Sequence, residues 1–156
     1  MMDDTTKTTP FSTSFDMIMS QFGYGDIRAG NLSTKSGDVA CSGVIMLLGI
    51  VGELSGSVAY TVDIENAKKI ASTMMMGMPV DEIDEMASSA LSELSNMLTA
   101  RAATVFSEMG VLIDISPPTF FQGEDVSVSM SSDTVLCLEL LADDIKVEAN
   151  IAVIRE

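Results

Sequence analysis

Glu93 and Asn96 lie three residues apart in a segment whose apolar residues recur at helical spacing. At about 100° per residue, side chains three positions apart lie next to each other on one face of an α-helix. A carboxylate can pair with a cation, and a carboxamide can both donate and accept hydrogen bonds. The two residues therefore offer one charged and one neutral polar group, side by side, to whatever approaches this face.

The rest of this helix face carries small side chains, namely Ser89, Ser92, Ala100 and Ala103. Between Ala87 and Thr104 the charged residues are Glu93 and Arg101 alone, whereas an ordinary solvated helix face carries several lysines and glutamates. Such a face suits close approach by a partner. It also suits burial against another helix of the same chain, and the residues alone leave both interpretations open.

The helix that carries the pair is predicted over Asp81–Met109, with Asp81 as its N-cap and Gly110 just after its end. Pro117 and Pro118 prevent any further helix. An apolar stripe along this helix is expected to pack on a sheet or on a neighbouring helix. The stripe comprises Ile83, Met86, Ala87, Ala90, Leu91, Leu94, Met97, Leu98, Ala102, Val105, Phe106 and Met109.

The elements around that helix predict an α+β fold, in which a mostly antiparallel sheet has two long helices packed on one face and an N-terminal helix. The other helices are predicted over Phe11–Phe22 and Ile64–Met76, and Gly23–Asp38 is predicted as a loop with at most a short strand. Residues 1–10 are expected to be disordered or frayed, and residues 11–156 to form a single domain. Strands are predicted at about Ala40–Val51, Leu54–Val62, Thr119–Gln122, Val126–Ser131, Thr134–Leu141 and Ile145–Ile154.

Composition limits the possible partners. The chain of 156 residues has 23 acidic and 8 basic residues, which gives a net charge of -15. Such a surface repels nucleic acid and anionic lipid, so neither is an expected partner. The longest uncharged apolar stretch, Gly43–Gly52, is about half of the ~20 residues that a membrane-spanning helix needs. The N-terminal residues lack the apolar core of a secretory signal, so a cytoplasmic location is expected.

Several kinds of active site are excluded or disfavoured by residue type. The chain has no histidine, which rules out a Ser–His or Cys–His triad and a histidine-based zinc site. Cys41 and Cys137 lie in apolar segments and are predicted to be buried free thiols. The acidic pairs 124–125 and 143–144 suit solvated turns better than a metal site. No metal or cofactor of its own is predicted, and no glycine-rich phosphate loop follows a strand.

The motif Ser89-x-x-x-Glu93-x-x-Asn96, within SSALSELSNMLTARAA, resembles the CheX members of the CheC/CheX/FliY family of response-regulator phosphatases. Three other stretches resemble the family in the same order: VGELSGSVAY (51–60), MMMGMPVDEIDEMA (74–87) and GVLIDISPPTFFQG (110–123). The resemblance covers about residues 43–154 and implies a CheC-like fold. A single Glu-x-x-Asn motif favours the CheX branch over the CheC branch, and CheX membership implies a homodimer with two sites.

The resemblance implies a function in which the protein removes the aspartyl phosphate of a CheY-like receiver domain that carries its own Mg²⁺. Glu93 would pair with the active-site lysine of the receiver. Asn96 would orient the attacking water without deprotonating it, because an amide is not a base. Ser89, Ser92 and Ala100 would form the contact floor. Two alternatives remain: a module that sequesters a phosphorylated receiver without turnover, and a purely structural homodimer joined through strand edges.

Two residues of the motif helix depart from the family pattern. Ser95 and Ala100 stand where family members often have glycine. Both replacements are small, so close approach of a partner is expected to survive them.

Overall fold

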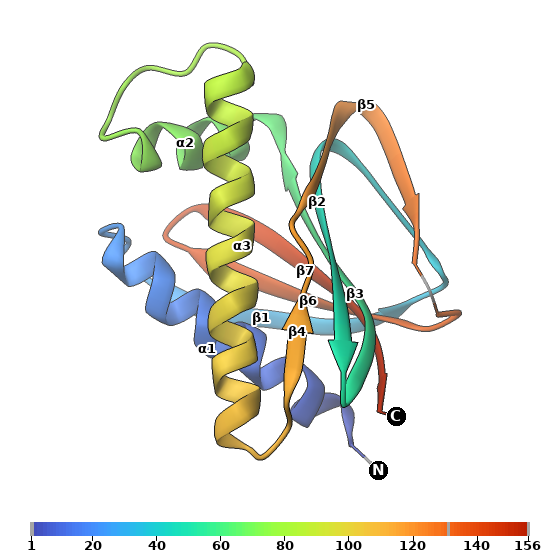
Figure 1. Ribbon diagram of the computed structural model, residues 1–156. Helices are drawn as coiled ribbons and strands as arrows, with labels where there is room; N and C mark the ends of the chain where they lie inside the picture. The colour runs from blue at the N-terminus through green and yellow to red at the C-terminus, as the bar shows by residue number, and fades with distance from the viewer. Residues whose placement is uncertain (1, 131, 156) are drawn as a thin grey trace.

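The computed structural model describes residues 2–130 and 132–155, and within them three helices pack on one face of a seven-stranded sheet (Figure 1). This arrangement confirms the predicted α+β class. The helices are α1 (Asp4–Gln21), α2 (Ile64–Met74) and α3 (Glu85–Glu108). The strands are β1 (Ile27–Lys35), β2 (Asp38–Gly52), β3 (Leu54–Asp63), β4 (Ile113–Ile115), β5 (Thr119–Ser129), β6 (Val135–Ala142) and β7 (Ile145–Arg155).

The sheet is antiparallel throughout, with the strand order β1-β6-β7-β3-β2-β4, and β5 also pairs with β2. The long strand β2 therefore has two neighbours on one side. β5 pairs with its first part, from Asp38 to Leu47, and β4 pairs with its last residues, from Ile50 to Gly52. This pairing places the chain between β4 and β5 beside Leu48 and Gly49, in the last third of β2.

Side chains alternate across the sheet, as expected for strands with period two. One face packs against the three helices and forms the main core, to which α1 contributes Phe11 and Phe15 and α3 contributes Phe106. The rings of Phe11 and Phe106 meet edge to face at 6.0 Å, an arrangement that suits aromatic quadrupoles. The reverse face has a smaller apolar cluster: Val39, Ile45, Ala59, Val128, Met130, Val135 and Ala152.

Helix α1 begins earlier than predicted. Its N-cap is Asp3, whose carboxylate accepts a hydrogen bond of 2.8 Å from the backbone N–H of Thr6. Residues 4–10, expected to be frayed, therefore form the start of α1, and Pro10 lies buried inside the helix. The prediction placed the start at Phe11 because residues 1–10 are polar and rich in threonine, whereas the apolar residues at helical spacing begin at Phe11.

The motif helix α3 begins at Glu85 and not at Asp81. Asp84 is its N-cap and accepts a hydrogen bond of 2.9 Å from the N–H of Ala87. Gly110 follows its end at φ +82°, as predicted. Helix α2 is capped in the same way by Asp63, and it ends at Met74, two residues before the predicted end.

The structure corrects three strand predictions. The region predicted as a loop contains the nine-residue strand β1, and β4 was not predicted. The two short strands predicted between Thr119 and Ser131 form one continuous strand, β5, whose described end is Ser129. Ser131 lies outside the described residues.

Two further expectations concern the thiols and the membrane. Cys41 and Cys137 are both free, as predicted; Cys137 is buried, whereas Cys41 is only half-buried. In the part of the chain that the structure describes, no helix combines the length and the apolar character needed to cross a bilayer.

Candidate functional site

Helix α3 turns one side to the core and the opposite side to solvent. Leu91, Leu94 and Leu98 are at most 3% exposed, whereas Glu93 is exposed and Asn96 is half-buried. The two polar side chains thus lie away from the core, where the helical period placed them, and neither is sealed inside the protein.

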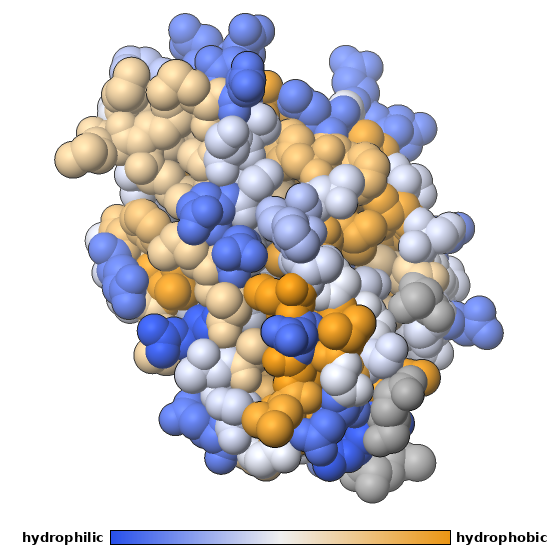
Figure 2. Space-filling view, in the orientation of Figure 1, coloured by the Kyte–Doolittle hydropathy of each residue, from blue (hydrophilic) through white to orange (hydrophobic). Residues whose placement is uncertain are grey.

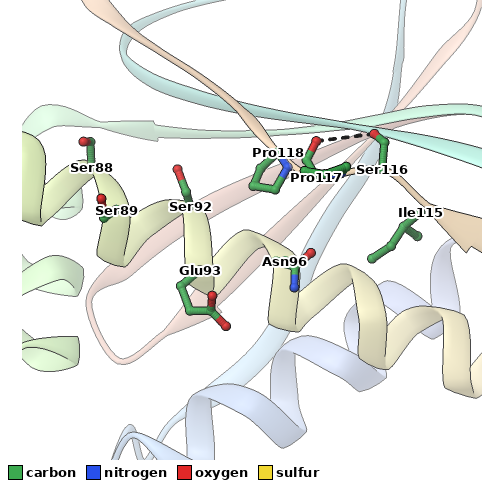
Figure 3. Close-up of a pocket in the computed structure, with 9 residues that line it drawn as sticks. All are labelled: Ser88, Ser89, Ser92, Glu93, Asn96, Ile115, Ser116, Pro117 and Pro118. Atoms are coloured by element: carbon green, nitrogen blue, oxygen red, sulfur yellow. Dashed lines mark hydrogen bonds between the residues drawn. The ribbon is translucent and has the colours of Figure 1, made fainter.

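Both residues line a pocket of about 510 Å³ between α3 and the chain that leads from β4 to β5. Helix α3 supplies one side through Ser88, Ser89, Ser92, Glu93 and Asn96, and the opposite side consists of Ile115, Ser116, Pro117 and Pro118. In Figure 3 the helix residues stand along one edge of the pocket and the 115–118 segment along the other, with Glu93 directed away from that segment.

The 115–118 segment, here called the proline wall, is fastened to the sheet. The hydroxyl of Ser116 accepts a hydrogen bond of 2.7 Å from the N–H of Gly49 in β2. The N–H of Ser116 donates in return to the carbonyl of Gly49 at 3.0 Å. The two prolines restrict their own backbone angles. The pocket is therefore bounded by two rigid elements, a helix and an anchored wall.

Helix α3 is held from behind by a chain of buried hydroxyls. Thr99 donates to the carbonyl of Ser95 at 2.7 Å, and its oxygen lies 2.9 Å from the hydroxyl of Tyr60 on β3. Because the Thr99 proton is already engaged, Tyr60 must be the donor in the second bond. Burial raises the pKa of Tyr60, so this phenol stays protonated. Ser14 of α1 donates to the carbonyl of Leu98 and adds a second tie.

The two polar side chains at the pocket are free to act on another molecule. Within the described residues, neither the Glu93 carboxylate nor the Asn96 carboxamide makes a side-chain hydrogen bond or an ion pair. A carboxylate without a cation and an amide without a partner can each bind an incoming group at no cost in broken internal bonds.

The three predicted contact residues are distributed along the same side of α3. Ser89 and Ala100 are exposed and Ser92 is half-buried. Ser89 and Ser92 line the pocket, whereas Ala100 lies about one turn beyond Asn96, outside the pocket lining.

Two expectations about α3 are wrong. Ser95 is completely buried, so it faces the core and has no part in partner approach. Met86 and Met109, both assigned to the apolar stripe, are 61% and 45% exposed. The stripe fails at the two ends of the helix, because Met86 lies only two residues after the N-cap and Met109 is the C-cap.

Ser88 and the proline wall belong to the pocket but were not identified from the sequence as site residues. The prolines were interpreted only as a barrier to helix. A signal was nevertheless present, since GVLIDISPPTFFQG is one of the stretches that resemble the family. What the sequence does not contain is the pairing of β4 with β2 that brings this stretch next to α3.

Of the acidic pairs considered as metal ligands, residues 143–144 bind other groups of the protein, and residues 124–125 lie within a strand. Asp143 accepts hydrogen bonds from the N–H groups of Gly25 and Asp26 at 3.3 and 2.8 Å, and Asp144 pairs with Lys69 at 3.4 Å. Residues 124–125 lie in β5. Among residues 2–130 and 132–155, no group of three or more Cys, Asp or Glu side chains is arranged to hold a metal ion.

Comparison with solved structures gives the class to which this fold and site belong. The chemotaxis protein CheX from Desulfovibrio desulfuricans matches with a TM-score of 0.83 at 21% identity, over 94% of this chain and 98% of that one. A CheX–CheY–BeF₃–Mg²⁺ complex from Borrelia burgdorferi matches with a TM-score of 0.80 at 27% identity, over 96% and 98% of the two chains. The protein is therefore an α+β domain of the kind found in chemotaxis proteins of the CheC and CheX type.

The amino-acid sequence narrows this class to one family. The family model described as chemotaxis phosphatase CheX matches residues 44–140, and the chain belongs to that family. The CheY-P phosphatase CheX of Thermotoga maritima is 36% identical over 101 residues, which cover 65% of this chain and 65% of that protein. The aligned region thus spans slightly less than two thirds of the curated relative.

Proposed function

We propose that this protein is a cytoplasmic phosphatase that hydrolyses the aspartyl phosphate of a CheY-like response regulator. Family membership supports this activity, as does the relative described as a CheY-P phosphatase. The observation that carries the assignment of residues is the free Asn96 carboxamide beside the exposed Glu93, at the edge of an open pocket.

Asn96 is the residue proposed to act on the attacking water. Its carboxamide can accept a hydrogen bond from that water and donate another to the phosphoryl group. As the water oxygen bonds to phosphorus, the bond from phosphorus to the aspartyl oxygen breaks, and the electron pair stays on the regenerated carboxylate. One water proton remains on the inorganic phosphate and the other passes to a phosphate oxygen or to solvent. Orientation of this kind can lower the activation barrier of hydrolysis by about 2–3 kcal/mol.

Glu93 is proposed to dock the partner. It lies one turn before Asn96 and has no cation of its own among the described residues, so it can pair with a lysine beside the phosphoryl group of the receiver. The receiver is expected to bring Mg²⁺ with its phosphate. The Borrelia complex contains Mg²⁺ and BeF₃ together with CheX and CheY, which supports that expectation for a related protein.

Phosphate release from a phosphorylated receiver tests both assignments. Asn96→Ala should lower the maximal rate about 30- to 150-fold with an unchanged unfolding curve. Asn96→Asp should be about as slow, because a carboxylate cannot donate and repels the phosphoryl group. Glu93→Ala should chiefly raise the receiver concentration needed for half-maximal rate. Asn31→Ala, which removes an exposed asparagine from β1, is the matched control.

Some results would contradict this proposal. Full activity in Asn96→Ala rules out the water-orienting role, and full activity in Asn96→Asp indicates a general base instead. If the wild-type protein binds the phosphorylated receiver but lengthens the lifetime of its phosphate, the protein is a sequestering module.

A homodimer is proposed as the assembly. The outer edge of β1 and the outer edges of β4 and β5 have no strand neighbour within the described residues, so their backbone groups are available to a second copy. The pocket is bounded by the chain between β4 and β5, at the other end of the sheet from β1, so pairing through the β1 edge would leave two sites open. Sedimentation analysis over a range of protein concentrations tests this assembly, and a monomer at micromolar concentration contradicts it.

A further inference from the structure

The connection between α2 and α3 and the first turn of α3 expose three methionine side chains. Met76, Met78 and Met86 are 96%, 53% and 61% exposed, and together they are called the methionine surface here. Figure 2 shows pale orange, moderately hydrophobic atoms gathered over α2 and the connection that leads from it to α3. Exposed apolar patches of this kind mark interaction sites more often than isolated apolar side chains do.

Met76 occupies a backbone conformation that disfavours a side chain. It has φ +62°, in the left-handed region, where a residue with a Cβ is less stable than glycine. The conformation belongs to the Schellman motif that ends α2. Met76 N–H donates to Thr73 at 3.3 Å, and Gly77 N–H donates to Ser72 at 2.8 Å.

The other two helices end in the same motif with glycine at the equivalent position. Gly23 follows α1 at φ +94°, and its N–H donates to Ser20 at 3.1 Å. Gly110 follows α3 at φ +82°, and its N–H donates to Ser107 at 3.0 Å. Helix α2 alone among the three described helices places a large side chain there, and that side chain lies almost wholly in solvent. At 96% exposure the Met76 side chain has little packing in the monomer to offset its backbone strain, which points to a contact with another molecule.

One member of the methionine surface, Met86, lies on the face of α3 that carries the proposed site. Met86 precedes Glu93 by seven residues, so at about 100° per residue the two lie nearly in line along the helix, with Ser89 between them. Asn96 lies in the same sector, about 80° from Met86 around the helix axis. A partner that reaches Asn96 with a reactive group and covers the first half of α3 would contact Met86.

The margin of the methionine surface is acidic. Asp81, Glu82 and Glu85 are exposed in the connection and at the start of α3. Protein interfaces commonly combine an apolar centre with a polar rim, and methionine adapts its shape to the surface that it meets. The complementary surface on a partner is therefore apolar at its centre and basic at its edge.

We propose that the methionine surface docks an apolar, basic-rimmed patch of the same receiver domain whose phosphoryl group reaches Asn96. This inference rests on the proposed function and adds to it a second contact region, separate from the pair that acts on phosphate. It assigns Met76, Met78 and Met86 to receiver affinity and not to the chemical step.

Met76→Gly provides the sharpest test, because folding and binding should change in opposite directions. The melting temperature should rise by about 2–4 °C, since the strain at this position is relieved. The dissociation constant for the receiver, activated with beryllofluoride and Mg²⁺, should rise about threefold to tenfold. The triple variant Met76→Gly, Met78→Ser, Met86→Ser should raise it about 10- to 100-fold, with the maximal rate of phosphate release within twofold of wild type.

Leu112→Ser is the matched control. Leu112 is 65% exposed and follows α3, so it lies near the far end of a 24-residue helix from Met86, and its replacement should leave receiver affinity unchanged. If the triple variant binds the receiver with wild-type affinity, the docking role is wrong. In that case the proposed function still stands, provided that Asn96→Ala loses activity. If the triple variant changes self-association but not receiver affinity, the methionine surface is a dimer contact and the docking proposal is wrong. If the wild-type protein binds no activated receiver, both proposals fail.

Discussion

The hydroxyls of Tyr60 and Thr99, on the buried side of α3, help to fix the position of the helix turn that carries Asn96. Thr99 lies three residues after Asn96 on the buried side, and its hydroxyl connects Tyr60 on β3 to the carbonyl of Ser95. The bond network therefore joins the sheet to the same turn of helix that presents the carboxamide. The reacting group itself has no internal partner, so its position depends on these neighbours.

The two members of this hydroxyl pair should differ in their effect on stability. Thr99→Val leaves the buried Tyr60 hydroxyl without an acceptor and should cost about 2–3 kcal/mol of unfolding free energy. Tyr60→Phe removes only a donor, because Thr99 still donates to Ser95, and should cost about 1 kcal/mol. Urea unfolding of both variants measures the difference. An equal or larger cost for Tyr60→Phe would contradict the donor assignment.

At the scale of elements, periodicity predicted which segments are helices but not where they begin. Asp81 and Asp84 are both suitable N-caps, and the structure uses the second, which lies three residues before the first fully buried side chain of α3, Ala87. The start of α1 was missed because its first turns are polar and rich in threonine and carry no apolar period. The segment of strand β1 was predicted as a loop with at most a short strand, because it is exposed along most of its length and shows no apolar alternation. Its pairing with β6 makes it a nine-residue strand.

The proline wall is the element whose support can be removed most selectively. Ser116→Ala deletes the acceptor for Gly49 N–H but leaves the bond from Ser116 N–H to Gly49 in place. The unfolding free energy should fall by about 1 kcal/mol. Phosphate release per unit of enzyme at low receiver concentration should fall about threefold to tenfold, because one side of the pocket becomes mobile.

The control for this variant is Ser129→Ala, at the other end of β5. The Ser129 hydroxyl donates to Asp38 at 3.0 Å on an exposed part of the sheet, at the opposite end of β5 from the pocket. Ser129→Ala should lower the unfolding free energy by a similar or smaller amount and should have no effect on phosphate release. If the two serine variants reduce activity equally, the wall has no specific role in the site.

At the scale of the whole molecule, the candidate site combines what the sequence can predict with what only the topology provides. Glu93 and Asn96 are close in sequence and share a helix, so their juxtaposition follows from the helical period. The proline wall lies about twenty residues further along, and it reaches the pocket because β4 returns to the edge of β2. The methionine surface depends on the conformation at the end of α2, which composition does not reveal.

The absence of histidine gives the whole molecule a simple response to pH. No ordinary side chain of this sequence titrates between about pH 6 and 8, so stability should be constant there. Burial raises the pKa of the Cys41 and Cys137 thiols above their ordinary value of 9.0, and Glu148 adds to the effect at Cys137. Burial also raises the pKa of Tyr24 and Tyr60.

Each of these four groups holds its proton more tightly in the folded protein than in the unfolded chain. Their contribution to stability is complete below the unfolded pKa and is lost as the pH rises through the folded value. The urea midpoint should therefore be flat from about pH 6 to 8 and should fall above about pH 9. The double variant Cys41→Ser, Cys137→Ser should flatten part of the alkaline decline. A midpoint that changes between pH 6 and 8 would show that a group outside these four controls stability.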